Sequence, residues 1–320
     1  MKPSFLNAGH LPTLIAAFLY FDVSFMVWVV LGPLGVQIAA DLQLSPAEKG
    51  VMVATPVFAG ALLRFVLGVI VDRVGPMTAG LYAQIVLILG LAAAWIVGIS
   101  SDANVLALGG LLGIAGASFA VALPLASRWY PPEHQGKALG VAGAGNSGTV
   151  LAALIAPGLA AAFGWRDVLG LALIPLIVVL VFYWLLAEDP PGEVAPRPLR
   201  AYLEVLTSRD AWWFMFFYFI TFGGFIGLAA SLTIYFSDQY HFDPVTAGYF
   251  TAACVFAGSL VRPLGGAIAD WLGGVRTLSI TFVVAALALS FASANDNSAA
   301  VALASFVVAT AQARPGCRVS

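Results

Sequence analysis

The stretch FAGALLRFVLGVIVDRVG, residues 58–75, places one arginine, Arg64, inside an apolar run long enough to cross a membrane. The run ends in a turn with the pattern Gly-x-x-x-Asp-Arg-x-Gly. The fixed residues of this turn are Gly68, Asp72, Arg73 and Gly75. A charged side chain within an apolar span is costly, so its presence indicates a partner or a function inside the membrane.

The same design returns 198 residues later in FAGSLVRPLGGAIADWLG, residues 256–273, and no gap is needed to align the two copies. Arg262 takes the place of Arg64 in the second copy, and Asp270 takes the place of Asp72. The repeat predicts two related halves, each presenting one arginine at the same depth of the membrane.

The composition is that of a polytopic membrane protein, with 61% hydrophobic residues, 9% charged residues and a mean hydropathy of +0.96. Such a chain predicts an all-α membrane protein in a lipid bilayer, with no nucleic-acid partner, metal or cofactor. Ten transmembrane segments are expected, at about 12–36, 50–71, 77–99, 104–126, 139–163, 167–187, 212–236, 246–268, 276–294 and 299–313.

These segments divide into two halves joined by a charged, proline-rich linker. We expect a six-helix N-terminal half at 1–187, a linker at 188–210 and an incomplete C-terminal half of about four spans at 211–320. The last residues, AQARPGCRVS, lose the apolar pattern, so the second half is expected to be truncated.

The distribution of lysine and arginine predicts the orientation, because cytoplasmic loops are enriched in these residues. Only Lys49 and Arg166 lie between segments on the side opposite the N-terminus. Ten others lie on the N-terminal side: Lys2, Arg73, Arg128, Lys137, Arg197, Arg200, Arg209, Arg276, Arg314 and Arg318. The N-terminus and the linker are therefore expected in the cytoplasm.

The two in-span arginines point to an anion. Each lies about 12 Å from its turn along the helix axis, at 1.5 Å per residue, and a guanidinium facing lipid there costs about 2.5 kcal/mol or more. Arg64 and Arg262 could each neutralise a carboxylate and hold helices together, but Asp22 is the one deep acid in the predicted spans. Two cations against one acid favour anion binding, and the arginine fork suits a planar oxyanion.

The fifth predicted segment begins with GKALGVAGAGNSGTV, residues 136–150, which is dense in glycine and contains one amide, Asn146. Small residues at a spacing of four predict close helix packing along one face. The residues with this spacing are Gly136, Gly140, Ala144 and Gly148. Packing does not account for Asn146, whose amide could donate a hydrogen bond to an oxyanion.

The chain resembles the nitrate/nitrite porter family of the major facilitator superfamily, a fold of two pseudo-symmetric six-helix halves. The resemblance is carried by RWYPPEHQGKALGVAGAGNSG, residues 128–148, which looks like the family's nitrate signature, by YFITFGGFIG, residues 218–227, and by the in-span arginines. It implies a glycine signature at Gly140, Gly143, Gly145 and Gly148. It also implies a substrate site in which Arg64 and Arg262 clamp the anion, Phe119, Tyr218 and Phe222 wall it, and Asn146 donates to it.

The implied function is secondary active transport of nitrate or nitrite across the bacterial cytoplasmic membrane, in nitrate assimilation, by a multi-pass monomer. Asp22 is either a structural partner of an arginine or a proton site, and the second role would make the protein a proton-coupled uptake system. The alternatives are a nitrate/nitrite antiporter, a facilitator for another small anion and a fragment that transports nothing. The family's second glycine signature, in its eleventh span, has no counterpart here.

An enzyme is not expected. The three histidines, His10, His134 and His241, lie at the ends of the predicted spans or in loops, and no histidine or cysteine constellation occurs within them.

Overall fold

The computed structural model describes residues 5–191, 198–260, 272–294 and 297–311, and within these ranges the chain is helical, without strands. The main helices of the first half are α1 (Leu11–Trp28), α2 (Gly35–Leu42), α3 (Pro46–Val74), α4 (Pro76–Val97), α5 (Asp102–Gly116), α6 (Phe119–Ser127), α7 (Pro132–Gly143), α8 (Gly148–Phe163) and α9 (Trp165–Leu186). Those that follow are α10 (Leu199–Glu204), α11 (Arg209–Tyr218), α12 (Gly224–Tyr240), α13 (Pro244–Leu260), α15 (Gly274–Ala294) and α16 (Ala299–Ala311).

The predicted membrane segments correspond to these helices. In the described ranges, eight helical stretches are long and apolar enough to span a membrane, some of them continuing through a short break. The shorter helices α13 and α16 fall on two further predicted segments. Two boundaries were wrong: the first span ends at Trp28, ahead of a turn and α2, and the fifth begins at Pro132. Part of the linker region is itself helical, because α10 and the short 3-10 turn Val205–Thr207 lie within it.

Local sequence determines where α3 begins and ends. Ser45 accepts a hydrogen bond from the Glu48 N–H, and the Glu48 carboxylate accepts one from the Ser45 N–H at 2.7 Å, so the two residues form a capping box. At the other end, Gly75 adopts φ 87°, a conformation that favours glycine. The last glycine of the sequence motif is thus a helix stop.

The first half is built around α1, which is buried along most of its length and contacts α5, α6, α7, α8 and α9. Trp28, at the end of α1, donates a hydrogen bond from its indole nitrogen to the Pro56 carbonyl oxygen of α3 at 2.7 Å. Its ring fills a space that exists because two neighbours are glycines: a Cβ at Gly60 would lie 3.0 Å from the indole, and one at Gly116 would overlap it. Trp28 therefore fixes α1 against α3 and α5.

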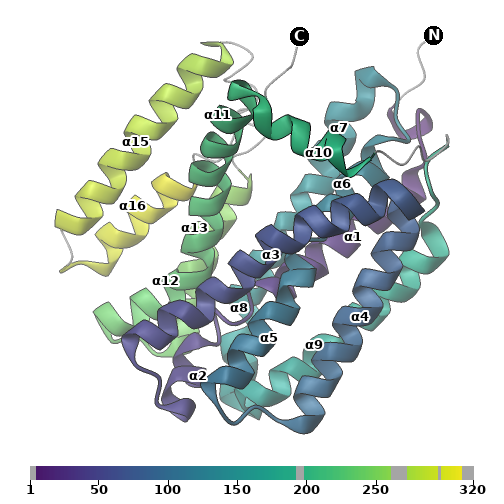
Figure 1. The fold of residues 1–320 in the computed structure, drawn as a ribbon. Helices are drawn as coiled ribbons and strands as arrows, with labels where there is room; N and C mark the ends of the chain where they lie inside the picture. The colour runs from purple at the N-terminus through teal and green to yellow at the C-terminus, as the bar shows by residue number, and fades with distance from the viewer. Residues whose placement is uncertain (1–4, 192–197, 261–271, 295–296, 312–320) are drawn as a thin grey trace.

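The two halves meet toward one end of the bundle. We call this end the far side, where α3 begins and α12 ends, and the opposite end the N-side, where α1 begins. In Figure 1, α10 crosses at the N-side between α11 and the first half. Helices α12 and α13 of the second half contact α2, α3 and α8 of the first. A Cβ at Gly32 would overlap the Ala230 carbonyl group, and one at Gly248 would lie 2.6 Å from the Ala153 carbonyl oxygen.

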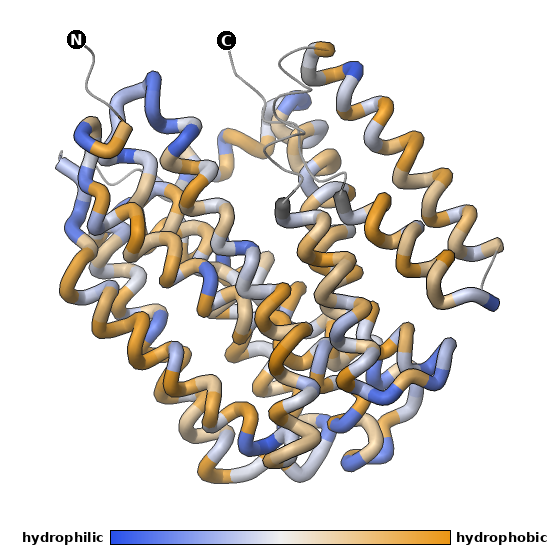
Figure 2. The backbone as a smooth tube through the Cα atoms, turned by 180° about the vertical axis from the view of Figure 1, so that it is seen from behind, coloured by the Kyte–Doolittle hydropathy of each residue, from blue (hydrophilic) through white to orange (hydrophobic). Residues whose placement is uncertain are grey.

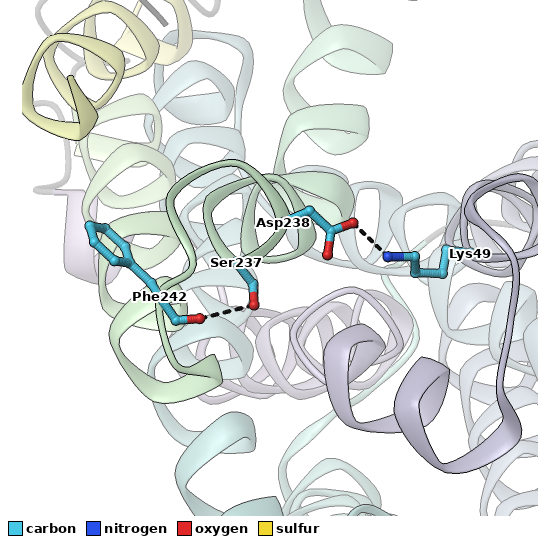
Figure 3. A network of polar contacts seen from close by, with 4 residues as sticks. All are labelled: Lys49, Ser237, Asp238 and Phe242. Carbon is cyan, nitrogen blue, oxygen red and sulfur yellow. Dashed lines mark hydrogen bonds and ion pairs between the residues drawn. The ribbon is translucent and has the colours of Figure 1, made fainter. Parts of the chain in front are cut away.

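A salt bridge also joins the halves at the far side. Lys49, near the start of α3, lies 2.5 Å from the carboxylate of Asp238 near the end of α12 (Figure 3). Next to it, the Ser237 hydroxyl donates to the Phe242 carbonyl oxygen at 2.9 Å and fastens the turn between α12 and α13. Lys49 is the one lysine that the sequence placed on this side, and its partner belongs to the other half.

The outer surface is apolar over the length of the helices. Figure 2 shows hydrophobic residues along the helices, with hydrophilic residues gathered mainly toward the two ends of the bundle. Large apolar side chains such as Phe58, Tyr82 and Val97 are strongly exposed. Exposure of this extent is typical of lipid-facing surface rather than of a water-soluble fold. The structure is that of a multi-pass membrane protein.

The close contact at Gly32 generates a prediction. Gly32→Ala places a methyl group where the Ala230 carbonyl now lies, so the halves cannot approach as they do here. Overpacking of this kind costs on the order of 1–3 kcal/mol, and the melting temperature of the purified protein should fall. Gly50→Ala is the matched control, because nothing lies within 4 Å of its Cβ position. Equal melting temperatures for the two variants would contradict the close packing.

Candidate functional site

The site is centred on Arg64, which α3 carries into the space between the two halves. Its Nη2 donates a hydrogen bond to the Gly116 carbonyl oxygen at 2.9 Å, and its Nη1 donates to the Tyr218 hydroxyl at 3.4 Å. Gly116 ends α5 of the first half, whereas Tyr218 ends α11 of the second. One guanidinium thus touches both halves of the protein.

The Gly116 acceptor exists because the helix breaks there. In a continuous helix the N–H of Ala120 would bond to the Gly116 carbonyl, but it bonds to the Ala117 carbonyl instead, at 2.9 Å. The break between α5 and α6 releases one carbonyl within the membrane, and Arg64 donates to it. A broken helix at this depth is tolerated when another group satisfies the released backbone.

Two aromatic rings lie against the same guanidinium. The Arg64 Cζ is 5.0 Å from the ring centroid of Phe119 and 5.4 Å from that of Phe222, within the range of cation–π contacts. Phe222 in turn stacks on Tyr218 at 5.0 Å. The structure therefore gathers four of the sequence-predicted site residues: Arg64, Phe119, Tyr218 and Phe222. Their role in binding stays a prediction.

Arg262, the proposed second half of the clamp, lies outside the described residues, as does Asp270. The contribution of the second copy of the motif therefore stays a prediction from sequence.

A cavity of about 320 Å³ extends from Arg64 toward the N-side. It is bounded by α3, α6 and α10, and its polar lining consists of Arg64, Asp72, Arg128 and Tyr202. Asp72 accepts hydrogen bonds from Arg128 at 3.1 Å and from the Tyr202 hydroxyl at 2.9 Å, so the mouth of the cavity is an ordered polar network. Among the motif residues, Gly68 lines the cavity, whereas Arg73 is exposed.

The helix of the glycine-rich segment is interrupted at the positions of Gly145 and Asn146. Helix α7 ends at Gly143, a 3-10 turn covers Ala144–Ser147, and α8 starts at Gly148. A Cβ at Gly148 would overlap the Asp22 carbonyl oxygen, and one at Gly145 would lie 2.6 Å from the Phe21 ring. Asn146, between these two glycines, is buried. The turn is therefore pressed against the backbone of α1 at Asp22.

The predicted packing stripe with a spacing of four was right at Gly148 and wrong at Gly136 and Gly140. Nothing lies within 4 Å of a Cβ at Gly136 or Gly140, nor at Gly143. The close contacts fall at Gly145 and Gly148, a spacing of three, because the 3-10 turn changes the helical period between α7 and α8.

Asp22 is buried in α1, with 8% of its surface exposed. Its carboxyl oxygen accepts a hydrogen bond from the Ser147 hydroxyl at 2.6 Å. Among the described residues no ion pair joins Asp22 to an arginine. Within that part of the chain, the groups that hydrogen-bond this acid are the Ser147 hydroxyl and the Gly148 backbone, at the end of the glycine-rich turn.

Sequence reasoning missed several residues of this arrangement: Trp28, Gly116, Ser147 and Tyr202. Ser147 stands beside Asn146 in the quoted signature, so its polarity among glycines was an available signal. The role of the Gly116 carbonyl as an acceptor for Arg64 could not be predicted, because it depends on a helix break that the composition does not indicate.

Comparison with known proteins gives this arrangement a context. Residues 13–314 match the Major Facilitator Superfamily. The chain is 34% identical over 285 residues to the nitrite extrusion protein of Bacillus subtilis, covering 89% of this chain and 71% of that protein. It is also 34% identical over 295 residues to the probable nitrate/nitrite transporter NarK2 of Mycobacterium tuberculosis, covering 89% and 73%.

The fold is also found among solved structures. A partially occluded, inward-open structure of the xylose transporter XylE from E. coli superposes with a TM-score of 0.73 at 15% identity, covering 96% of this chain and 82% of XylE. At this identity the likeness concerns the fold, and it confirms the fold class predicted from the sequence.

The contact between the glycine-rich turn and α1 generates a second prediction. Gly148→Ala must displace the turn from the Asp22 carbonyl, which disturbs the Ser147–Asp22 hydrogen bond. We expect poor yield of folded protein and a lower melting temperature, by several degrees, in detergent. Gly140→Ala, in the same signature but in open space, should behave as the parent does. A Gly148→Ala protein as stable as the Gly140→Ala protein would contradict the described contact.

Proposed function

Because this chain belongs to the nitrate/nitrite porter family of the major facilitator superfamily, we propose that it transports nitrate, and nitrite as a related planar anion, across a membrane. Its N-terminus and linker lie in the cytoplasm of a bacterium under this proposal, as the distribution of lysine and arginine indicates.

The observation that carries the proposal is the setting of Arg64. A guanidinium at membrane depth lies against two neighbouring phenylalanine rings contributed by different halves, whose centroids are 6.2 Å apart, at the inner end of a cavity. Flat rings beside the guanidinium suit a flat ion, and a guanidinium can donate two parallel hydrogen bonds to two of its oxygens.

The binding step follows from the contacts. Arg64 donates at 2.9 Å to Gly116, which fixes the guanidinium plane, and at a longer 3.4 Å to Tyr218. Nitrate entering along the cavity would take up the Nη1 donor, and the Tyr218 hydroxyl could turn to donate to the anion. Arg262, by its place in the repeat, would provide the second fork from the opposite half, and Asn146 an additional amide donor.

We further propose that uptake is coupled to protons through Asp22. Nitrate is the anion of a strong acid and cannot carry the proton itself, whereas a buried carboxyl group in the first span can. Exchange of nitrate for nitrite is the second candidate, favoured by the name of the Bacillus subtilis relative, which describes nitrite export. An exchanger needs no proton, so proton flux separates the two candidates.

The arginine prediction tests the substrate site. Arg64→Lys keeps the charge but loses the fork, so nitrate affinity should fall at least tenfold, which corresponds to about 1.4 kcal/mol. Isothermal titration calorimetry on protein in lipid nanodiscs measures this directly, and uptake of labelled nitrate into proteoliposomes should fall in parallel. Arg166→Lys is the control, because Arg166 pairs with Asp41 at 2.7 Å on the far side. Unchanged nitrate affinity in Arg64→Lys would refute the proposed site.

The coupling prediction concerns Asp22. Asp22→Asn should abolish proton uptake that accompanies nitrate entry, measured with a pH-sensitive dye inside proteoliposomes. Counterflow of labelled nitrate should persist, because the contacts of Arg64 do not involve this carboxyl group. Nitrate accumulation driven by a proton gradient in the Asp22→Asn protein would place the coupling elsewhere.

A further inference from the structure

The Ser147 hydroxyl lies within hydrogen-bond distance of two acceptors. Its oxygen is 2.6 Å from the Asp22 carboxyl oxygen and 2.8 Å from the Ala144 carbonyl oxygen. A hydroxyl has one proton to donate and two lone pairs that accept. It cannot donate to both oxygens at the same time when Asp22 is ionised, so one of the two contacts then lacks a proton.

Protonation of Asp22 resolves this conflict. A carboxylic acid O–H donates to the Ser147 oxygen, and the Ser147 O–H is released to donate to Ala144. When Asp22 loses its proton to water, the Ser147 O–H rotates to the carboxylate, and the Ala144 carbonyl loses this side-chain donor. Each protonation state of Asp22 therefore corresponds to one orientation of the Ser147 hydroxyl.

The position of Ala144 connects this switch to the glycine-rich turn. Ala144 is the first residue of the 3-10 turn, and the Gly148 N–H bonds to the carbonyls of Asn146 and Gly145. The hydroxyl of Ser147 is thus a side-chain donor to the Ala144 carbonyl, in addition to the Ser147 N–H that the 3-10 pattern directs there. Because Ala144 is exposed, water can replace this donor, and the two orientations can be close in free energy.

We infer that Ser147 is a positioning residue that converts the protonation state of Asp22 into two arrangements of the turn holding Asn146. This inference rests on the proposed function, in which Asn146 faces the anion and Asp22 carries the proton. Protonated Asp22 releases Ser147 to close the turn on Ala144 and removes a negative charge near the site, and both changes favour anion binding. Proton and anion then strengthen each other's binding, as linkage requires.

The surroundings of Asp22 leave few competing charges. Of the elements packed against α1, the 3-10 turn, α6 and α8 contain no titratable side chain. Helix α5 has Asp102 at its far-side end, and α9 has Arg166 and Asp167 there, with Tyr183 in contact with Tyr20 toward the N-side. Helix α7 carries Glu133, His134 and Lys137 near its N-side end, and Arg64 of α3 reaches Phe119, which contacts Phe21.

The test compares three variants at the turn. Ser147→Ala removes the switch, and Ser147→Thr restores a hydroxyl at the same place. Thr149→Ala is the matched control, because the Thr149 hydroxyl donates to the Asn146 carbonyl oxygen at 2.7 Å, a local bond of the same kind without contact to Asp22. The first readout is the nitrate dissociation constant against pH, measured by calorimetry on the full chain in nanodiscs.

In the parent protein we expect nitrate affinity to rise at least fivefold, the low end of measured couplings, as the pH falls through the titration of Asp22. Ser147→Ala should reduce this change to less than about half, while Ser147→Thr and Thr149→Ala should retain it. Asp22→Asn should bind nitrate independently of pH. Full pH dependence in Ser147→Ala would overturn the inference, as would its equal loss in Thr149→Ala.

A second readout does not need nitrate. Infrared difference spectra between acid and neutral pH should show the carbonyl band of protonated Asp22, identified by its loss in Asp22→Asn. The band should shift in Ser147→Ala, where the acid loses its acceptor, and stay in place in Thr149→Ala. If nitrate does not bind the parent protein at any pH, the proposed function fails, and this band alone decides the inference. An absent or unshifted band overturns it.

Discussion

A guanidinium inside a membrane must be given acceptors and polarisable neighbours, and much of the described structure follows from this requirement at Arg64. Helix α5 breaks at Gly116 and frees a carbonyl for it, and Phe119, which begins the next helix, lies over its face. Gly116 must be a glycine because Trp28 fills the space beside it. The same indole anchors α1 to α3 through Pro56. The packing of three helices is thus tied to the placement of one charge.

The glycine-rich turn provides a hydrogen-bond partner for the other buried ionisable group, Asp22. Gly145 and Gly148 let the backbone of the turn come against α1 at Phe21 and Asp22, which brings the Ser147 hydroxyl within 2.6 Å of the carboxyl oxygen. A larger residue at Gly148 would force the two elements apart. The glycines of the signature therefore let the main chain of the turn pack closely against the main chain of α1. This close packing positions the polar residues of the signature.

Long apolar segments and the in-span arginine could be predicted from sequence, because hydropathy and charge depend on residue type alone. The aromatic residues near the arginine were predicted only from the family resemblance. The acceptor of Arg64 could not be predicted, since the Gly116 carbonyl becomes available only through a helix break. The packing stripe failed at two of its glycines for a similar reason: the spacing of four assumes a continuous helix, and the Ala144–Ser147 turn interrupts it. The Asp22–Ser147 bond joins residues 125 apart in sequence, a pairing that the chain's local pattern does not encode.

The contacts of Arg64 would also connect the proposed anion binding to movement of the two halves. The halves are closed at the far side by the Lys49–Asp238 salt bridge and the contact of Gly32 with Ala230. Arg64 joins them at the centre, through Tyr218 and Phe222 of the second half. Any rearrangement that opens the far side must therefore change what surrounds the guanidinium. An anion held between Arg64 and residues of the second half would add attraction across this boundary, so the occupied site favours halves drawn together, and the empty site, with its positive charge, favours them less.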